Sequence, residues 1–178
     1  MRYVALLRGI NVGGANKVSM ADLKAAFEAA GMAEVRTYIN SGNVIFSSDV
    51  EDRPKLTGLL EGAIRERCAL GIDVLLRHAE ELRAVVDAMP GDWRNDDTMK
   101  CDVVFLRDDV DGAAVLEDLQ PRPGIEDALC VPGAIVWRID RTHATSSRLL
   151  RIVGTPLYKR VTVRNCNTAR KLLELLGV

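Results

Sequence analysis

The order in which two kinds of apolar pattern alternate limits the fold of this chain more than any other feature. Short runs rich in Val, Ile and Leu predict strands, and apolar residues at i, i+3, i+4 and i+7 predict helices between them. The strands are expected over 2–8, 35–39, 44–47 and 72–76. The helix core positions are expected at Leu23, Ala26, Phe27 and Ala30, then at Leu56, Leu59, Leu60, Ala63 and Ile64. The order is therefore β-α-β-β-α-β.

The same order is expected a second time after a helix over 79–89. Strands are expected over 102–106, 128–131, 134–139 and 161–163, and helices over 113–119, 147–153 and 169–176. Pro132 and Gly133 fit the two central positions of a type II turn between two of these strands. Two such successions predict an α+β fold of two tandem ferredoxin-like units, whose antiparallel sheets are covered by helices. The expected boundaries are 1–77 for the first unit, 78–99 for a connecting helix and linker, and 100–178 for the second unit with its C-terminal helix.

Local signals support the first helix and the first hairpin. Ser19 and Asp22 form an S-x-x-D capping signal, and Gly31 is expected to end the helix that they begin. The Asn-Ser-Gly-Asn stretch over 40–43 is typical of a hairpin turn, because Gly and Asn tolerate positive φ.

Composition indicates a globular, cytoplasmic protein. Of the 178 residues, 48% are hydrophobic and 28% charged, which is typical of a chain with a core. Arg8 interrupts the apolar N-terminal stretch, and no apolar run is long enough to span a bilayer, so no membrane association is expected. The four cysteines form no C-x-x-C pair and are expected to be reduced and buried; they are Cys68, Cys101, Cys130 and Cys166.

The loop over 9–17 is the first candidate binding segment. It lies between a predicted strand and a predicted helix, where backbone N–H groups hold anions in many proteins. It is not a Walker A loop, because Lys17 comes three residues after Gly14 and is followed by Val18. The alternative is a tight structural connection. The candidate ligand contacts are Arg8, Asn11, Gly13 and Gly14.

Two further segments carry candidate contacts. Arg36 and Tyr38 share one strand face, and Asn43 belongs to the following turn; the alternative is that the turn residues serve only local backbone. Arg164 and Asn165 lie between a predicted strand and the last helix. There one polar residue is expected to be an N-cap, which leaves Arg164 as an anion contact.

Charge is unevenly distributed although the formal net charge is only −1. Residues 141–173 contain eight Lys or Arg and no acid, whereas residues 108–127 contain seven acids and one Arg. If the first and last segments meet, their cations are expected to line one positive groove that attracts phosphates. The alternative is separate solvated faces, with arginines paired to the acidic segment. The groove cations are Arg8, Lys17, Arg36, Lys159, Arg160 and Arg164.

The sequence contains no complete arrangement of residues typical of a catalytic or metal-binding site. His78 and Glu81 form a lone H-x-x-E pair without the further ligands of a metal site. Ser41 lacks the G-x-S-x-G elbow of a serine hydrolase. The sequence therefore predicts no catalytic residue, no metal and no cofactor.

Residues 6–14, 36–46 and 162–168 together resemble a family of bacterial proteins known as domain of unknown function 1697 (DUF1697), and the resemblance extends over nearly the whole length. It implies a soluble bacterial protein with tandem ferredoxin-like units. It carries over no catalytic residue, cofactor or partner.

These observations lead to one functional hypothesis and two alternatives. The hypothesis is a non-catalytic protein that binds a phosphate-bearing ligand, a nucleotide or a nucleic-acid backbone, at a site built from the 8–14 loop, the 36–43 hairpin and the 164–168 segment. One alternative is an enzyme that acts on a small anionic metabolite, with Tyr38 or a carboxylate moving protons. The other is a protein–protein interaction or oligomerisation module. The oligomeric state is left open.

Overall fold

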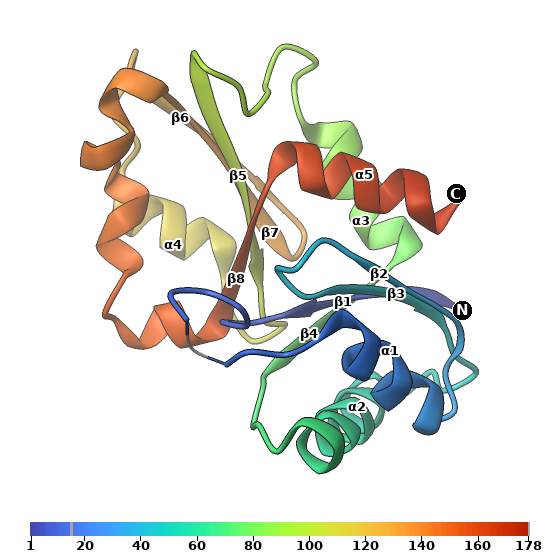
Figure 1. Ribbon diagram of the computed structural model, residues 1–178. Helices are drawn as coiled ribbons and strands as arrows, with labels where there is room; N and C mark the ends of the chain where they lie inside the picture. Colours follow the sequence, from blue (N-terminus) through green and yellow to red (C-terminus); the bar gives the residue numbers. More distant parts are fainter. Residues whose placement is uncertain (15, 178) are drawn as a thin grey trace. The chain divides into compact units, whose positions relative to one another are not determined.

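The computed structural model describes residues 1–14 and 16–177 (Figure 1). The chain divides into two compact units, one of Met1–Ala79 with the C-terminal residues from Glu174, the other of Glu80–Leu173. Each unit contains one four-stranded antiparallel sheet and helices, so the fold is α+β. Most of the stretch that the sequence marks as a connection groups with the second unit.

The first unit follows the order that the sequence predicts. Its elements are β1 (Arg2–Leu7), α1 (Met20–Ala29), β2 (Ala33–Tyr38), β3 (Asn43–Ser47), α2 (Arg53–Cys68) and β4 (Val74–His78). The strand order across the sheet is β2-β3-β1-β4, and α1 and α2 lie together on one face of it (Figure 1). The two helices pack on that face because alternate residues of the strands present apolar side chains to them.

A cluster of aromatic rings lies at the centre of the first core. The ring of Phe46 stacks on Tyr3 at a centroid distance of 5.6 Å and meets Phe27 edge-on at 5.3 Å. Each fully buried phenylalanine contributes roughly 1.5–3 kcal/mol through burial. Leu59, expected in this core, is instead 44% exposed. Leu56 and Leu60, four residues apart, already cover the sheet, and the helical turn carries Leu59 away from it.

Side-chain caps define where the helices begin. Ser19 Oγ accepts a hydrogen bond from the Asp22 N–H at 3.0 Å and donates one to Asp22 Oδ2 at 2.7 Å, which confirms the capping prediction. Asp52 Oδ1 accepts from the Lys55 N–H at 3.0 Å at the start of α2. Each such cap is worth about 1 kcal/mol. Gly31, with φ +84°, follows the end of α1 as predicted.

The rest of the chain contains four strands and several helices. The main elements are α3 (Ala79–Ala88), β5 (Met99–Leu106), α4 (Gly112–Leu119), β6 (Glu126–Val131), β7 (Ala134–Asp140), β8 (Val161–Asn165) and α5 (Cys166–Leu176). The sheet order is β6-β7-β5-β8. β6 and β7 join at a tight turn in which Gly133 has φ +76°, as the Pro-Gly pair predicts. Trp137 lies in the core on the face that α4 covers.

The connection from β7 to β8 differs from the prediction of one α-helix over 147–153. Three 3-10 helices replace it: η1 (Arg141–Ser146), η2 (Arg148–Ile152) and η3 (Pro156–Arg160). Gly154, with φ +83°, and the proline that opens η3 break the segment into pieces too short for a stable α-helix. Leu149 and Ile152 of η2 still pack into the second core beside Trp137.

The cysteines are only partly as expected. All four are free thiols, but Cys101 and Cys166 are buried whereas Cys68 is half-buried and Cys130 is exposed. Cys130 is the one exposed residue of β6, an edge strand of its sheet. Within the part of the chain that the structure describes, no helix is long and apolar enough to cross a membrane.

Candidate functional site

β1 leads the chain into a loop over 8–18, in which Gly9, Val12, Gly13, Gly14, Asn16 and Lys17 are exposed while Ile10 and Val18 are buried. The half-buried Arg8 begins it, and its backbone N–H donates to the Asp73 carbonyl at 3.1 Å. Gly13 and Gly14 are exposed and have φ of +59° and +81°. A Cβ added at either glycine would meet no atom within 4 Å, so glycine is needed there for its backbone conformation alone. The loop therefore presents backbone to solvent in a shape that other residues rarely adopt.

The side chain of Asn11 holds this loop in place. Its Nδ2 donates to the Val18 carbonyl at 3.0 Å and to the Asn40 carbonyl at 2.9 Å, and its Oδ1 accepts from the Val18 N–H at 2.9 Å. The first of these contacts closes the loop on itself, and the second joins it to the turn between β2 and β3. Two of the three segments singled out in the sequence therefore lie side by side.

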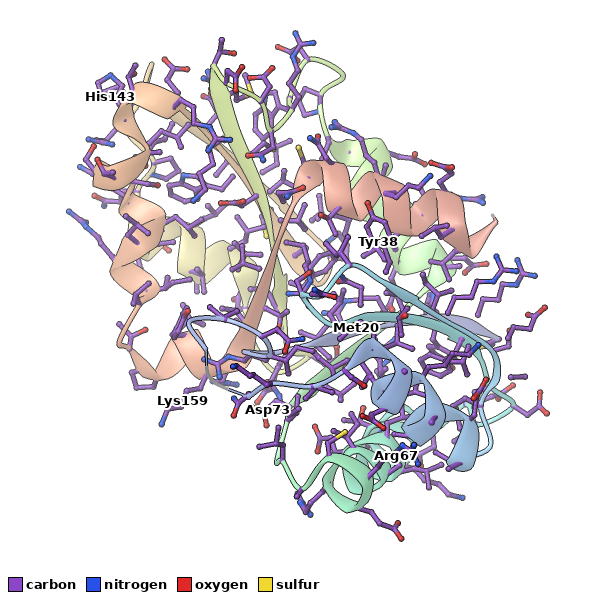
Figure 2. All side chains as sticks on the ribbon, in the orientation of Figure 1. Met20, Tyr38, Arg67, Asp73, His143 and Lys159 are labelled. Atoms are coloured by element: carbon purple, nitrogen blue, oxygen red, sulfur yellow. The ribbon has the colours of Figure 1, made fainter. Side chains whose placement is uncertain are left out.

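A shallow depression of about 440 Å³ lies beside this junction. Its lining residues are Asn11, Gly14, Lys17, Val18, Ser19, Met20 and Asn40. Lys17 is exposed, and no described residue forms a hydrogen bond or ion pair with its side chain. Arg67 of α2, which lies beside α1 in Figure 2, is by contrast already engaged: it forms an ion pair with Asp22 of α1 at 3.2 Å. Lys17 is thus a positive charge available to a ligand at the depression.

The hairpin residues separate into supporting and exposed groups. Asn43 is buried, and its Nδ2 donates to the Tyr38 carbonyl at 3.0 Å and to Ser41 Oγ at 3.1 Å, so its amide stabilises the turn. Among the described residues, the hydroxyl of Tyr38 and the guanidinium of Arg36 have no hydrogen-bond partner. Arg36 lies opposite Ile45 and lines a different cavity, of about 40 Å³, from the one beside Asn11.

The third segment lies in the second unit. Arg164 is 8% exposed, and its Nη1 donates to the Val163 carbonyl at 2.9 Å. Burial lowers the pKa of Arg164 to about 10, so the side chain remains charged at neutral pH. Asn165 Oδ1 accepts from the Thr168 N–H at 2.8 Å and caps α5, as the capping alternative predicts. In this segment, the charge of Arg164 is the feature that capping does not explain.

Several of the cations over 141–173 make contacts inside the second unit. Arg160 pairs with Asp109 of the acidic segment, and Arg148 Nη1 donates to the Gln120 carbonyl. Arg141 donates from Nε to the Asp96 carbonyl at 2.9 Å. Figure 2 shows His143 and Lys159 at opposite ends of the 3-10 segment. The charges are therefore spread along this connection rather than gathered at one point.

A buried carboxylate that the sequence does not single out organises the start of η2. Glu126 Oε1 accepts from Ser147 Oγ at 2.8 Å and from the Arg148 N–H at 2.7 Å, while its Oε2 accepts from Arg122 Nε at 3.0 Å. Burial opposes ionisation, but these hydrogen bonds outweigh it and hold the pKa of Glu126 below its ordinary value. A polar depression of about 500 Å³ lies over this network; it is lined by Arg122, Thr145, Ser146, Ser147, Arg148, Leu150 and Arg151.

The only signal of this second depression in the sequence is the absence of acids around Arg148 and Arg151. Among residues 1–14 and 16–177, no group of three or more His, Cys, Asp or Glu side chains is arranged to hold a metal ion. What the site geometry offers is shaped backbone, hydroxyl groups and cationic side chains, which are groups that bind anions.

Comparison with known proteins identifies the family. The family model described as "Protein of unknown function (DUF1697)" matches residues 1–137. The chain belongs to the DUF1697 family. Among solved structures, it is similar to the conserved bacterial protein SP0830 from Streptococcus pneumoniae, with 28% sequence identity, a TM-score of 0.81 and 98% of each chain covered. This similarity supports the α+β fold described for the DUF1697 chain.

Other comparisons add little. A search of curated proteins finds no match to this DUF1697 chain. An unknown protein from Galdieria sulphuraria matches at 14% identity over 98% of this chain and 91% of its own, with a TM-score of 0.26. That score is too low for the match to bear on the fold. The function of this DUF1697 member must therefore be argued from its own residues.

Proposed function

We propose that this protein binds a phosphate-bearing ligand, a nucleotide or a nucleic-acid backbone, and does not transform it. The observation that carries the proposal is the Asn11 amide, which joins the loop over 8–18 to the Asn40 carbonyl at 2.9 Å. A loop fixed in this way keeps its exposed backbone in one shape before a ligand arrives, which lowers the entropy cost of binding.

The backbone of this loop has the conformation that suits an anion. Asn11 and Gly13 have positive φ, whereas Val12 between them does not. Positive φ at Asn11, Gly13 and Gly14 makes this part of the loop turn sharply, and backbone N–H groups at turns bind anions in other proteins. We assign Gly13 and Gly14 the backbone contacts and Lys17 a charge contact at the neighbouring depression. Asn11 and Asn43 act as positioning residues.

Cationic and hydroxyl side chains supply the remaining contacts in the first unit. We assign Arg8, at the start of the loop, to the ligand's charge. Because Arg36 lines a separate cavity, we assign Arg36 and Tyr38 to the more distant polar groups of an extended ligand such as a nucleic-acid backbone. Arg36 is exposed and Tyr38 is half-buried, and among the described residues neither side chain is engaged by another group. Both are therefore available without the loss of an internal hydrogen bond.

In the second unit, we propose Arg164 as an anion contact, with Asn165 holding the adjacent helix start. A desolvated guanidinium gains more from an anion than an exposed one does, because water screens their attraction less. The lowered pKa of Arg164, about 10, reflects that desolvation.

We also infer that both units are ferredoxin-like, which would make the fold a tandem of that type. Support comes from the strand orders β2-β3-β1-β4 and β6-β7-β5-β8, which are the same when the strands of each sheet are numbered from one. Support also comes from the position of α1 and α2 on one face of the first sheet (Figure 1). We place the protein in the cytoplasm, because its four cysteines are free thiols.

The test is a thermal-shift panel at low salt with inorganic phosphate, nucleotides, short RNA, short DNA and simple carboxylates. A ligand at 100 times its dissociation constant stabilises the folded state by about 2.7 kcal/mol. We expect phosphate-bearing ligands to raise the melting temperature of the wild type. We expect Lys17→Ala to reduce that shift, and the matched control Lys24→Ala, an exposed lysine paired with Glu28, to keep it.

The same panel separates the alternatives. Carboxylates that shift the melting temperature as strongly as phosphates would favour an enzyme of small anionic metabolites. No shift with any ligand would contradict the proposal and favour an interaction module. For nucleic acid, neutralising about four phosphates gives a log–log salt slope of about −3 to −4, whereas a flat response would exclude that ligand class.

A further inference from the structure

Two cysteines from distant parts of the chain meet across one ladder of the second sheet. β5 pairs antiparallel with β8, and Asp102 lies opposite Asn165. This is the last pair of the ladder: Cys101 precedes Asp102 on β5, and Cys166 follows Asn165 as the first residue of α5. The two thiols are in hydrogen-bond contact, and both residues are 0% exposed. The structure therefore holds two reduced thiols against each other.

The backbone around this pair already suits a disulfide. The ladder pair next to the two cysteines, Asp102 and Asn165, has the Cα separation of directly opposed antiparallel residues, about 4.5–5.5 Å. A disulfide needs a Cα separation of about 4.4–6.8 Å. Formation of the bond then requires side-chain rotation and a small approach of the two sulfurs, with little movement of β5 or β8.

The surroundings shift the pKa values of the two thiols in opposite directions. Arg170, one helical turn along α5, places its Nη1 3.6 Å from Cys166 Sγ. The hydrogen bond from Cys101 is the largest factor that lowers the pKa of Cys166, and Arg170 adds to it. The same hydrogen bond, together with burial, raises the pKa of Cys101. Cys166 is thus the thiol that ionises first, and Cys101 remains protonated beside it.

We propose that Cys101 and Cys166 form a reversible disulfide when the protein meets a hydroperoxide. The Cys166 thiolate attacks the peroxide, an S–O bond forms while the O–O bond breaks, and the leaving oxygen takes a proton to become an alcohol or water. The sulfur of Cys101 then attacks the sulfenic acid, the S–S bond forms, and the hydroxyl leaves as water with the Cys101 proton. Two electrons pass from the sulfurs to the peroxide, and a dithiol restores the reduced pair by exchange.

A short segment before β5 lies against the pair. The Trp93 carbonyl lies 4.0 Å from Cys166 Sγ, and Asn95 Oδ1 accepts from the Cys101 N–H at 3.4 Å. Asn167 Nδ2 of α5 donates to the Asn95 carbonyl at 2.9 Å, which ties this segment to the helix. Because the thiols are covered, a small oxidant such as hydrogen peroxide reaches them more readily than a bulky disulfide reagent does.

The test uses the double variant Cys68→Ser/Cys130→Ser, which retains only the proposed pair. It is treated with hydrogen peroxide, unfolded, alkylated and weighed by mass spectrometry. We expect an intramolecular disulfide: loss of two hydrogens, no alkylation, and full recovery of both thiols after treatment with a dithiol. Two alkylatable thiols after oxidation, or a disulfide between chains, would overturn the proposal. Peptide mapping of the oxidised wild type shows whether Cys101 is linked to Cys166 without any substitution.

Two further variants test the roles of the two sulfurs. In Cys101→Ser the sulfenic acid at Cys166 has no resolving thiol, so we expect it to accumulate and react with a dimedone probe. Arg170→Met removes the charge beside Cys166, and we expect slower oxidation at neutral pH with the difference vanishing at high pH. If dimedone labels no sulfenic acid at Cys166 in oxidised Cys101→Ser, Cys166 is not the attacking thiol and the proposal is overturned. These readouts involve no ligand, so their outcome is independent of the phosphate-binding proposal.

Discussion

Arg77 and Arg164 occupy matching positions in the two sheets. Each is the fourth residue of a five-residue edge strand, β4 or β8, that precedes an α-helix. Each lies opposite a valine of the neighbouring central strand, Val4 for Arg77 and Val103 for Arg164. Each donates from Nη1 to the carbonyl of the residue before it, at 2.7 Å and 2.9 Å. The two units thus repeat a buried arginine although no sequence identity links the halves.

Replacement of Arg164 by methionine should cost less free energy of unfolding than replacement by alanine, because a side chain of similar size leaves a smaller cavity. Arg164→Ala leaves a cavity and should lose about 2–4 kcal/mol. Urea unfolding measures both, with the exposed Arg151→Met as the control. A loss in Arg164→Met as large as that in Arg164→Ala would show that the contacts of the guanidinium, and not the filled space, stabilise the fold.

Removal of the Asn11 side chain should loosen the loop that the proposed function depends on. Asn11→Ala leaves the Val18 N–H and two carbonyls without their partner and puts alanine at φ +53°. We expect a loss of about 2–4 kcal/mol in urea unfolding. Asn11→Gly removes the same hydrogen bonds without the backbone strain, so it should lose about 1 kcal/mol less. Equal losses in the two variants would mean that strain at φ +53° is negligible.

Gly42 and Gly13 should respond very differently to alanine. A Cβ at Gly42 would lie 2.6 Å from Ile10 Cδ1 and 2.8 Å from Leu7 Cβ, and its φ is +79°. A Cβ at Gly13 would meet nothing within 4 Å, so only the strain of its positive φ remains. We expect Gly13→Ala to lose about 1–2 kcal/mol and Gly42→Ala about 2–5 kcal/mol, measured by thermal unfolding. Similar losses would contradict the tight packing of the turn against β1.

Glu126 should contribute to the dependence of stability on pH. Its pKa in the folded state lies below the ordinary value of 4.5. Its stabilisation is therefore complete above about pH 4.5 and is lost as the pH falls through the lowered folded-state pKa. Glu126→Gln presents an amide to donors such as Arg122 Nε and should lose about 2–4 kcal/mol at pH 7.

The comparison with the wild type should be made across pH, with the exposed Glu117→Gln as the control. We expect the difference between Glu126→Gln and the wild type to shrink below pH 4.5, since protonation removes the same charge. A difference that stays constant down to pH 3 would show that the network does not lower the pKa of Glu126.

Local signals predicted the first unit well. The S-x-x-D signal at Ser19, the turn before Asn43 and the 3.6-residue period of Leu56 and Leu60 each act over a few residues, and each is found in the structure as expected. The segment from β7 to β8 was predicted less well. Its conformation depends on Leu149 and Ile152 packing into a core whose other members lie far away in the sequence.

For the candidate binding segments too, the sequence predicted the local features but not the tertiary contacts. The sequence indicated that the loop over 8–14 and the turn over 40–43 carry polar backbone, because Gly and Asn have local conformational preferences. It did not indicate that the Asn11 amide would be used to join them, or that Asn43 would be buried under the turn. Those assignments depend on which hydrogen-bond partners the fold brings within reach.

The sequence by itself determined the order of strands and helices, the helix caps and the turn positions, because these follow from interactions between residues close along the chain. The tertiary structure alone decided that Cys101 lies against Cys166, that Glu126 is surrounded by donors and that Arg164 is desolvated. The first two features join residues that are far apart in the chain, Cys101 with Cys166 and Glu126 with Ser147, and the third depends on burial by the whole core. They exist only after strand pairing and burial have excluded water, and no local pattern records them.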